Sequence, residues 1–193
     1  MKTDIILSGV GGQGILSIAT IIGEAATHSG LHLKQAEVHG MSQRGGDVQS
    51  NLRLSDSPIA SDLIAQGTAD MILSLEPMEA LRYLPYLDRE GWIITSSAPF
   101  KNIPNYPDEQ ALKDELAQLP HIILVDVEKI AHEHNMPKCA NVILLGAASR
   151  YLGIVSVDEL RDSIARVFGS KGAAVVEMNQ KAFDLGHAAA ENK

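Results

Sequence analysis

The sequence predicts a Rossmann-like α/β fold, with a mostly parallel sheet, helices on both of its faces and a helical C-terminal part. Three observations support this prediction. Short apolar segments, typical of buried strands, alternate with segments of helical periodicity along most of the chain. Glycines join the first strand directly to the first helix, and the pattern from Asn141 onward is helical. Because each connecting helix packs back onto the sheet, this alternation is typical of parallel strands.

The N-terminal part contains a strand, a helix and a second strand. The apolar run DIILSG predicts a buried strand over Asp4–Gly9, and LHLKQAEV predicts a strand over Leu31–Val38. Between them, apolar residues recur at helical spacing: Ile15, Ile18, Ile22, Ala25 and Ala26. The composition of Gly40–Asp47 predicts a loop.

The next segment, Val48–Ser55, alternates in polarity, which is the pattern of a half-exposed strand. Its two expected faces are Val48, Leu52 and Leu54 on one side and Gln49, Asn51 and Arg53 on the other. Further apolar runs predict strands over Met71–Leu75, Trp92–Ser97 and His121–Val127.

Prolines mark two further features of the middle of the chain. Pro77 is suited to the first turn of the helix that follows the fourth expected strand. The segment 98–109 contains Pro99, Pro104 and Pro107, and we expect a surface excursion or a lid there.

The C-terminal helices are expected to cap the same core. One expected apolar face consists of Leu160, Ile164, Val167 and Phe168, and a second of Val175, Met178, Ala182 and Phe183. No repeat, linker or low-complexity tract divides the chain, so residues 1–193 are expected to form a single domain.

The composition excludes several classes of protein. The formal net charge is -8, which argues against a general binder of nucleic acid or of acidic membranes. The single cysteine, Cys139, cannot form an internal disulfide, and it makes an iron–sulfur cluster or a Cys-rich zinc site implausible. No apolar run approaches the length of a membrane span, and the apolar start is too short for a signal peptide. We therefore expect a cytoplasmic protein.

The glycine loop is the first candidate ligand site. Gly9, Gly11 and Gly14 have the G-x-G-x-x-G spacing of a dinucleotide loop. A strand that ends in glycines and turns into a helix directs free N–H groups and the positive helix end at one spot, which suits a phosphate. A dinucleotide site also needs an acidic residue about 20 positions on, and Glu37 nearly meets that spacing. The alternative is a tight turn without a ligand.

A second loop carries Arg44 beside Gly45 and Gly46, at the expected carboxyl end of the second strand. Open α/β folds bind ligands at that edge of the sheet, so we expect the two loops to be neighbours. An arginine held by flexible glycines can make two parallel bonds to a phosphate or carboxylate. The alternative is a surface loop with a solvated arginine.

Five segments together resemble the gamma-type domain of the 2-oxoacid:ferredoxin oxidoreductases: GVGGQG, AEVHGMSQRGGDVQSNLRLSD, ADMILSLEPMEALRYLPYL, NVILLGAAS and VEMNQKAFDLG. They cover most of the chain. The stretch EVHGMSQRGG is most similar to the indolepyruvate branch, in which this domain is the separate small beta subunit.

The resemblance implies a non-redox subunit of an enzyme that converts an arylpyruvate, CoA and oxidised ferredoxin into an acyl-CoA, carbon dioxide and reduced ferredoxin. Thiamine diphosphate and the iron–sulfur clusters would belong to a large alpha subunit, and this chain would contribute to CoA binding and active-site closure. It would bind no cofactor tightly and would be inactive alone.

The resemblance also assigns residues. Those implied for CoA binding are Gly11, Gly12, Gln13, Gly14, Ser42, Arg44, Gly45 and Gly46, with Asn51 as a weaker member. No catalytic residue and no metal ligand is assigned. His39, next to the second loop, is a candidate contact to substrate or CoA.

The stretch AHEHNMPKC offers weaker candidates. His132, His134 and Cys139 resemble part of a zinc deaminase pattern, but its second cysteine is missing, and the two histidines would point to different faces of a helix. A solvated helix end is therefore favoured, with Cys139 buried at the start of the next helix. Asn141 is expected to be the N-cap of that helix.

Two alternative functions remain open at this point. One is an independent NAD(P)-binding oxidoreductase, which the absence of a convincing acid–base pair near the glycine loop weakens. The other is a regulatory or structural partner that binds no ligand, which the position of Arg44 between polar residues and glycines weakens.

Overall fold

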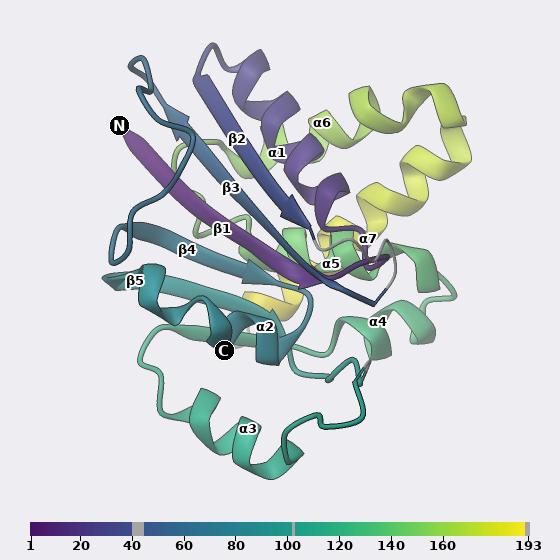
Figure 1. Cartoon of the computed structure of the whole chain (residues 1–193). Helices are drawn as coiled ribbons and strands as arrows, with labels where there is room; N and C mark the ends of the chain where they lie inside the picture. Colours follow the sequence, from purple (N-terminus) through teal and green to yellow (C-terminus); the bar gives the residue numbers. More distant parts are fainter. Residues whose placement is uncertain (40–44, 102, 192–193) are drawn as a thin grey trace.

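The computed structural model describes residues 1–39, 45–101 and 103–191 of the chain. These residues form a six-stranded sheet with the order β2-β3-β1-β4-β5-β6 (Figure 1). The strands are β1 (Lys2–Val10), β2 (His32–His39), β3 (Asp47–Ser55), β4 (Ala69–Ser74), β5 (Leu87–Ser96) and β6 (Ile122–Val125). β1, β4, β5 and β6 run parallel, whereas β3 is antiparallel to both of its neighbours. The predicted mostly parallel sheet is therefore confirmed, with one inserted antiparallel strand.

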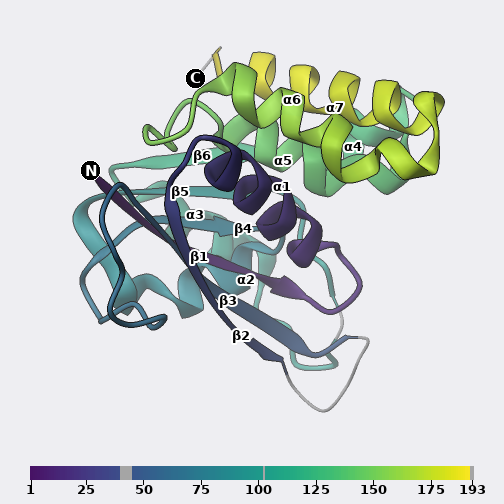
Figure 2. The same ribbon diagram turned by 90° about the horizontal axis from the view of Figure 1, so that it is seen from above.

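Helices cover both faces of the sheet (Figure 2). One face carries α1 (Ile15–His28), α5 (Ala140–Ala148), α6 (Val157–Phe168) and α7 (Ala173–Glu191). The other carries α2 (Pro77–Arg82) and the short 3-10 turn η1 (Leu84–Tyr86), with α3 (Glu109–Ala117) in contact with α2. α4 (Val127–Glu133) and the 3-10 turn η2 (Pro137–Cys139) lead from β6 into α5, and the 3-10 turn η3 (Gly169–Lys171) leads into α7. None of the described helices is long and apolar enough to cross a membrane.

The alternation within β3 divides its side chains between the two faces of the sheet, as expected, but the strand is not half-exposed, because Asn51 on its polar face is also buried. Leu52 and Leu54 join the core beneath α1, together with Ile5 and Leu7 of β1. On the opposite face, Asn51 lies directly across from Ile6, which belongs to the second core beneath α2. Because the second core is small, polar contacts have to hold the chain against that face.

The expected strand over Trp92–Ser97 is longer in the structure, because β5 begins at Leu87. Leu87 pairs with Ala69, and the register then shifts before Trp92 pairs with Met71. The polar residues between them are exposed, so apolar patterning did not mark them as strand. β6 ends at Val125 because Asp126 caps α4 through a hydrogen bond from the Lys129 N–H.

The expected apolar face of α7 is wrong at Met178, which is 43% exposed. The buried stripe of α7 consists instead of Asn179, Ala182, Phe183, Gly186 and Ala190. Its register is set by α5, because a Cβ at Gly186 would lie 1.8 Å from the Ile143 carbonyl oxygen, and a Cβ at Gly146 would lie 2.0 Å from the Phe183 carbonyl oxygen. The two helix backbones therefore touch, and this close approach decides which side of α7 is buried.

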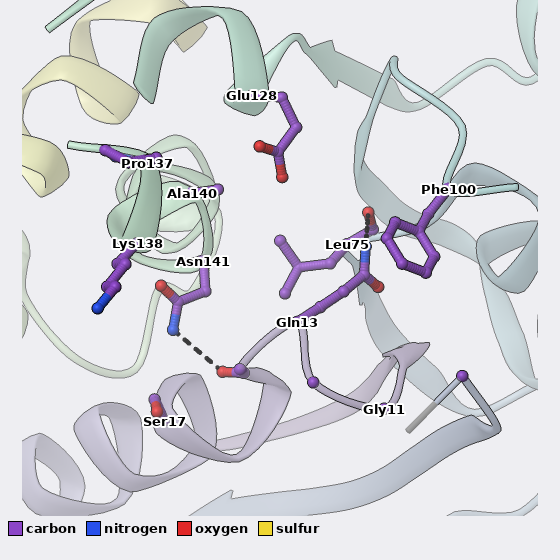
Figure 3. A pocket seen from close by; sticks show the side chains of 13 residues that line it. Gly11, Gln13, Ser17, Leu75, Phe100, Glu128, Pro137, Lys138, Ala140 and Asn141 are labelled. Atoms are coloured by element: carbon purple, nitrogen blue, oxygen red, sulfur yellow. Dashed lines mark hydrogen bonds between the residues drawn. The ribbon is translucent and has the colours of Figure 1, made fainter. Parts of the chain in front are cut away.

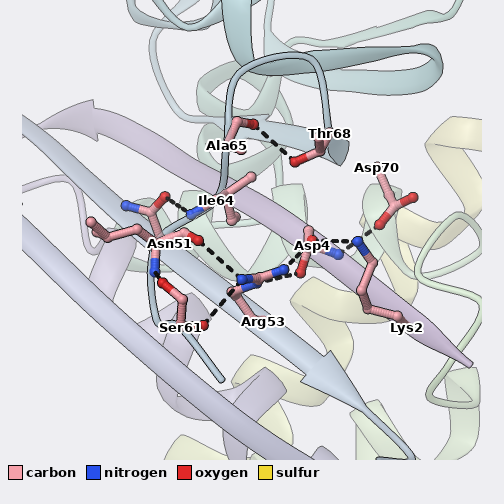
Figure 4. Close-up of polar contacts among 10 residues, drawn as sticks. Lys2, Asp4, Asn51, Arg53, Ser61, Ile64, Ala65, Thr68 and Asp70 are labelled. Carbon is pink, nitrogen blue, oxygen red and sulfur yellow. Dashed lines mark hydrogen bonds and ion pairs between the residues drawn. The ribbon is translucent and has the colours of Figure 1, made fainter. Parts of the chain in front are cut away.

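A buried ion pair holds the segment 56–68 against the second face (Figure 4). The Asp4 carboxylate is fully buried and accepts two hydrogen bonds from Arg53, at 2.8 Å from Nε and 2.9 Å from Nη2. Arg53 Nη1 then donates to the carbonyl oxygens of Ser61 and Leu63, at 3.1 and 3.0 Å. One guanidinium thus joins β1, β3 and an irregular segment, with its fixed fork geometry matched to each acceptor.

Opposing effects act on the pKa of Asp4. Burial alone would raise it, but hydrogen bonds from Arg53 and Lys2 outweigh burial and hold the pKa below its ordinary value. A lowered pKa in the folded state stabilises the protein above the ordinary pKa of aspartate, and this contribution is lost as the pH falls through the folded-state pKa.

Replacing Arg53 with methionine tests how much the Asp4–Arg53 ion pair contributes to the free energy of unfolding. The change leaves Asp4 buried with only Lys2 Nζ, 2.7 Å from its Oδ2, as a charged partner. We expect the free energy of unfolding to fall by about 3 kcal/mol at neutral pH, which is the lower end of the cost of breaking a buried pair. Urea unfolding of the purified chain measures it, with the exposed Arg89→Met as the control.

The difference between wild type and Arg53→Met should shrink as the pH falls through the acid range, because without Arg53 the pKa of Asp4 rises, and its carboxylate is protonated in the variant at a higher pH than in the wild type. A difference that stays constant down to acid pH would show that Arg53 acts through packing alone.

Candidate functional site

The candidate site is a cavity of about 610 Å³ at the carboxyl ends of β1 and β4 (Figure 3). The glycine turn after β1 forms its floor, and the start of α5 with the preceding η2 forms one wall. Phe100 lies on the opposite side. The lining residues are Gly11, Gly12, Gln13, Gly14, Ser17, Gly45, Leu75, Phe100, Glu128, Pro137, Lys138, Ala140 and Asn141.

The glycine turn has a conformation that side chains would oppose. Gly12 and Gly14 have φ of 101° and 89°, in the left-handed region that favours glycine. A Cβ at Gly12 would meet no atom within 4 Å, so the backbone there faces open space on the cavity side. Such a turn leaves room for a ligand to approach the main chain closely.

Gln13 holds this turn in place through both ends of its amide. Its Oε1 accepts a hydrogen bond from the Val10 N–H at 2.7 Å, and its Nε2 donates to the Leu75 carbonyl oxygen at 3.3 Å. The side chain therefore ties the end of β1 to the end of β4. Its role in the structure is to shape the cradle, and a direct contact of its amide to CoA stays a prediction.

Two helix N-termini converge on the cavity. α1 begins after Gly14 with no acidic residue in its first turn and no side-chain cap, and α5 begins after Cys139 with the same two features. Within the described part of the chain, the N–H groups of Gly12 and Gly14 have no protein acceptor. Lys138, in η2 next to the N-cap of α5, adds a positive charge to the lining. Uncapped helix ends with a lysine favour an anion.

Asn141 links the two helix ends, and it is not the N-cap that the sequence suggested. The N-cap of α5 is Cys139, so Asn141 lies within the first turn. Its Nδ2 donates to the Gly14 carbonyl oxygen at 3.1 Å, and a Cβ at Gly14 would lie 2.6 Å from that same nitrogen. The local capping preference is overridden by a tertiary contact across 127 residues of sequence.

The second glycine loop lies against the first, as expected, for the residues that the structure describes. The Gly11 N–H donates to the Gly46 carbonyl oxygen at 2.8 Å, and the Gly45 N–H donates to the Gly11 carbonyl oxygen at 3.3 Å. Gly45 lines the cavity. Ser42 and Arg44 lie outside the described residues.

Asn51 lies away from the lining residues. It is 3% exposed on the second face of the sheet, and its Oδ1 accepts a hydrogen bond from the Ile64 N–H at 3.2 Å. Its described contact is thus structural, because it helps to hold the segment 56–68. A part in CoA binding stays a prediction.

Strand order bears on the dinucleotide alternative. The sequence placed Glu37 near the glycine loop by assuming that the second strand lies next to the first. In the structure β3 separates them, and Glu37 pairs across from Ser50 of β3. The acidic residue therefore lies one strand farther from the glycine turn than a dinucleotide site requires.

The candidates in AHEHNMPKC have no functional feature among the described residues, whereas the side chain of His39 lies outside them. Cys139 is 2% exposed, and burial raises the pKa of its thiol, which disfavours the reactive thiolate. His132 and His134 are exposed around the end of α4, and the described residues contain no cluster of potential metal ligands.

Of the eight lining residues that sequence reasoning missed, four are aromatic, charged or amide side chains that could contact a ligand: Phe100, Glu128, Lys138 and Asn141. Three of them follow β6, whose carboxyl end lies at the same edge of the sheet as the glycine turn. Because parallel strands end at a common edge of the sheet, the place of these residues after a predicted strand is the signal that could have located them.

Comparison with known proteins relates the whole chain to one family. The family described as pyruvate ferredoxin/flavodoxin oxidoreductase matches residues 4–189. Indolepyruvate oxidoreductase subunit IorB of Pyrococcus horikoshii is 36% identical over 97% of this chain and 96% of its own length.

Two solved structures share the fold. The gamma subunit of a keto/oxoacid ferredoxin oxidoreductase from Geobacter sulfurreducens has a TM-score of 0.70 and 25% identity, covering 99% of both chains. A 2-oxoglutarate:ferredoxin oxidoreductase from Magnetococcus marinus, solved with 2-oxoglutarate, coenzyme A and succinyl-CoA, has a TM-score of 0.77 and 21% identity. This chain matches 31% of that longer protein.

The Gly14–Asn141 contact generates a prediction on coupling. Gly14→Ala introduces both left-handed strain and a clash with Asn141, at a combined cost of about 2–3 kcal/mol in the free energy of unfolding. Asn141→Ala alone loses one hydrogen bond, at about 1 kcal/mol. The double variant should be more stable than the sum of these losses, because Asn141→Ala removes the clash. Urea unfolding of the four proteins gives the coupling energy.

Gly12→Ala is the matched control, since it carries similar strain but meets no neighbour. Its cost should be the same with or without Asn141. Simple additivity of Gly14→Ala and Asn141→Ala would contradict the predicted packing.

Proposed function

Since the chain belongs to the pyruvate ferredoxin/flavodoxin oxidoreductase family, we propose that it is the small, non-redox subunit of an indolepyruvate:ferredoxin oxidoreductase. The complete enzyme oxidatively decarboxylates an arylpyruvate and transfers the acyl group to CoA, with the two electrons passing to ferredoxin. This chain contributes to CoA binding and to closure of the active site. As part of the same proposal, the complex works in the cytoplasm.

The distribution of cofactors between the two subunits follows from the residues that this chain contains and lacks. Its single cysteine cannot hold an iron–sulfur cluster, and the sequence has no G-D-G…N-N arrangement of the kind that binds thiamine diphosphate. The proposal therefore assigns thiamine diphosphate and the clusters to a large alpha subunit. Electron transfer and decarboxylation take place there, and ferredoxin docks on the complex.

The observation that carries the CoA assignment is the convergence of two uncapped helix N-termini on the glycine turn. A pyrophosphate needs several N–H donors and a positive field, and the turn at Gly12 offers both without a side chain in the way. Lys138 strengthens the field from the α5 side. Glu128 is the acidic member of the lining, so the phosphates belong at the glycine turn, and Glu128 is suited to accept hydrogen bonds from ribose or base donors.

Two other functions fit the structure less well. An NAD(P)-dependent enzyme needs an acidic residue on the strand next to β1, and the position of β3 removes Glu37 from that place. A regulatory or structural protein that binds no ligand would not need a cavity of about 610 Å³. It would also not need the N–H groups of Gly12 and Gly14 in the floor of that cavity, which are unpaired among the described residues.

Reconstitution with the large subunit tests the proposed function. The chain alone should show no oxidoreductase activity with indolepyruvate, CoA and ferredoxin, because it lacks thiamine diphosphate and clusters. The large subunit alone should also be inactive or nearly so, and mixing the two should restore CoA-dependent reduction of ferredoxin. Full turnover by the large subunit alone would contradict the proposal.

Arg44 gives a sharper prediction for the same complex. Its neighbours Gly45 and Gly46 are bonded to Gly11, and a charge-assisted bond from Arg44 to a CoA phosphate is worth about 1.5–3 kcal/mol. Arg44→Ala should therefore raise the KM for CoA roughly ten- to a hundred-fold and leave the KM for the oxoacid nearly unchanged. Arg44→Lys should recover part of the loss, because an ammonium cannot form paired bonds.

The matched control is Arg89→Ala. It removes an exposed arginine near the start of β5, at the amino-terminal end of the parallel strands and thus at the end opposite to the glycine turn. It should leave both KM values unchanged. If Arg44→Ala lowered the melting temperature enough to explain the loss, the residue would be structural.

A further inference from the structure

Phe100 is half exposed although it has an apolar ring that folding would normally bury. It is 47% exposed and lines the cavity. In Figure 3 its ring lies beside Gln13 and Leu75, across the cavity from Lys138 and Asn141. The cavity therefore has a positive side, formed by helix ends and a lysine, and an aromatic side.

A buried carboxylate fixes the backbone of Phe100. Glu76 follows β4, is fully buried, and caps α2 by accepting a hydrogen bond from the Glu79 N–H at 2.9 Å. Its other oxygen, Oε1, accepts from the Phe100 N–H at 3.3 Å and from the Tyr106 hydroxyl. Among the described residues no lysine or arginine forms an ion pair with Glu76. Bonds to a buried anion are strong, so this carboxylate anchors both the Phe100 backbone and the Tyr106 hydroxyl.

Two features of this arrangement lower the stability of the folded protein: the buried Glu76 carboxylate and the exposed Phe100 ring. Burial of a carboxylate without a cation is unfavourable, and exposure of a phenylalanine forgoes hydrophobic stabilisation. Both costs are explained if the ring has a partner that is absent from the chain itself. The partner has to be flat and apolar on its face and joined to an anion, because the positive side of the cavity lies opposite.

We infer that Phe100 is the stacking platform for the adenine ring of CoA, positioned by Glu76 and Tyr106, with the pyrophosphate at the glycine turn. This inference rests on the proposed function and adds the part of the ligand that the aromatic side of the cavity recognises. Every nucleobase has a π-face, and removal of a stacking aromatic typically weakens binding by about five- to a hundred-fold. Phe100 thus favours whole CoA over smaller thiols.

The test uses two thiol substrates of the reconstituted complex. One is CoA, and the other is 4′-phosphopantetheine, which carries the reactive thiol but no adenosine. Phe100→Ala should raise the KM for CoA about tenfold and leave the KM for 4′-phosphopantetheine within about twofold. The inhibition constant of adenosine 3′,5′-bisphosphate, which has the base but no thiol, should rise by the same factor as the KM for CoA.

Three variants complete the experiment. Phe100→Tyr keeps a stacking ring and should retain the wild-type preference for CoA. Tyr106→Phe removes one donor to Glu76 and should raise the KM for CoA by a smaller factor, again without an effect on 4′-phosphopantetheine. Ile103→Ala, on the same segment and 36% exposed but outside the cavity lining, is the control and should change neither constant.

Each other outcome has a definite meaning. An equal rise in KM for both thiols would place Phe100 against the pantetheine arm and overturn the inference. No change with either thiol would overturn it as well, and in both cases saturation of the wild-type complex by CoA would leave the proposed function standing. If the wild-type complex does not depend on CoA at all, the proposed function itself fails.

Discussion

The site depends on one constraint, which is that the glycine turn after β1 is bonded to three separate parts of the chain. Gly11 exchanges backbone hydrogen bonds with Gly45 and Gly46, Gln13 reaches the end of β4, and Gly14 accepts from Asn141 of α5. Three of the four residues Gly11–Gly14 are glycines and have no side chain to pack, so these bonds set the position of the turn. The direction of α1, the wall formed by α5 and the depth of the cavity all follow from it.

The molecule gathers favourable donors at one place although it is acidic as a whole. The formal net charge is -8, yet the cavity lining contains one lysine, one glutamate and two helix N-termini. Backbone dipoles act over a short range and are fixed by folding, so they attract an anion locally without making the surface cationic. A small anionic ligand is thus compatible with a chain that does not favour nucleic acid.

Much of the fold could be predicted from the sequence because the relevant information is local. Apolar runs marked the strands, and alternation assigned the two faces of β3. The failures have a common cause in contacts between distant segments. Asn141 looks like a cap when only its neighbours are considered, whereas Gly14 decides its role, and the strand order that moved Glu37 away has no local signal. The glycine cradle was therefore predictable, whereas the wall opposite it was not.

The contact between α5 and α7 limits which second substitutions could compensate for a change at Gly146 or Gly186. At Gly146 and Gly186 the obstacle to a side chain is a carbonyl oxygen of the other helix, not another side chain. A substitution elsewhere can shrink a side chain, but it cannot shorten a main chain. A defect at either glycine therefore has no simple second-site suppressor, and a genetic screen for revertants should return glycine itself.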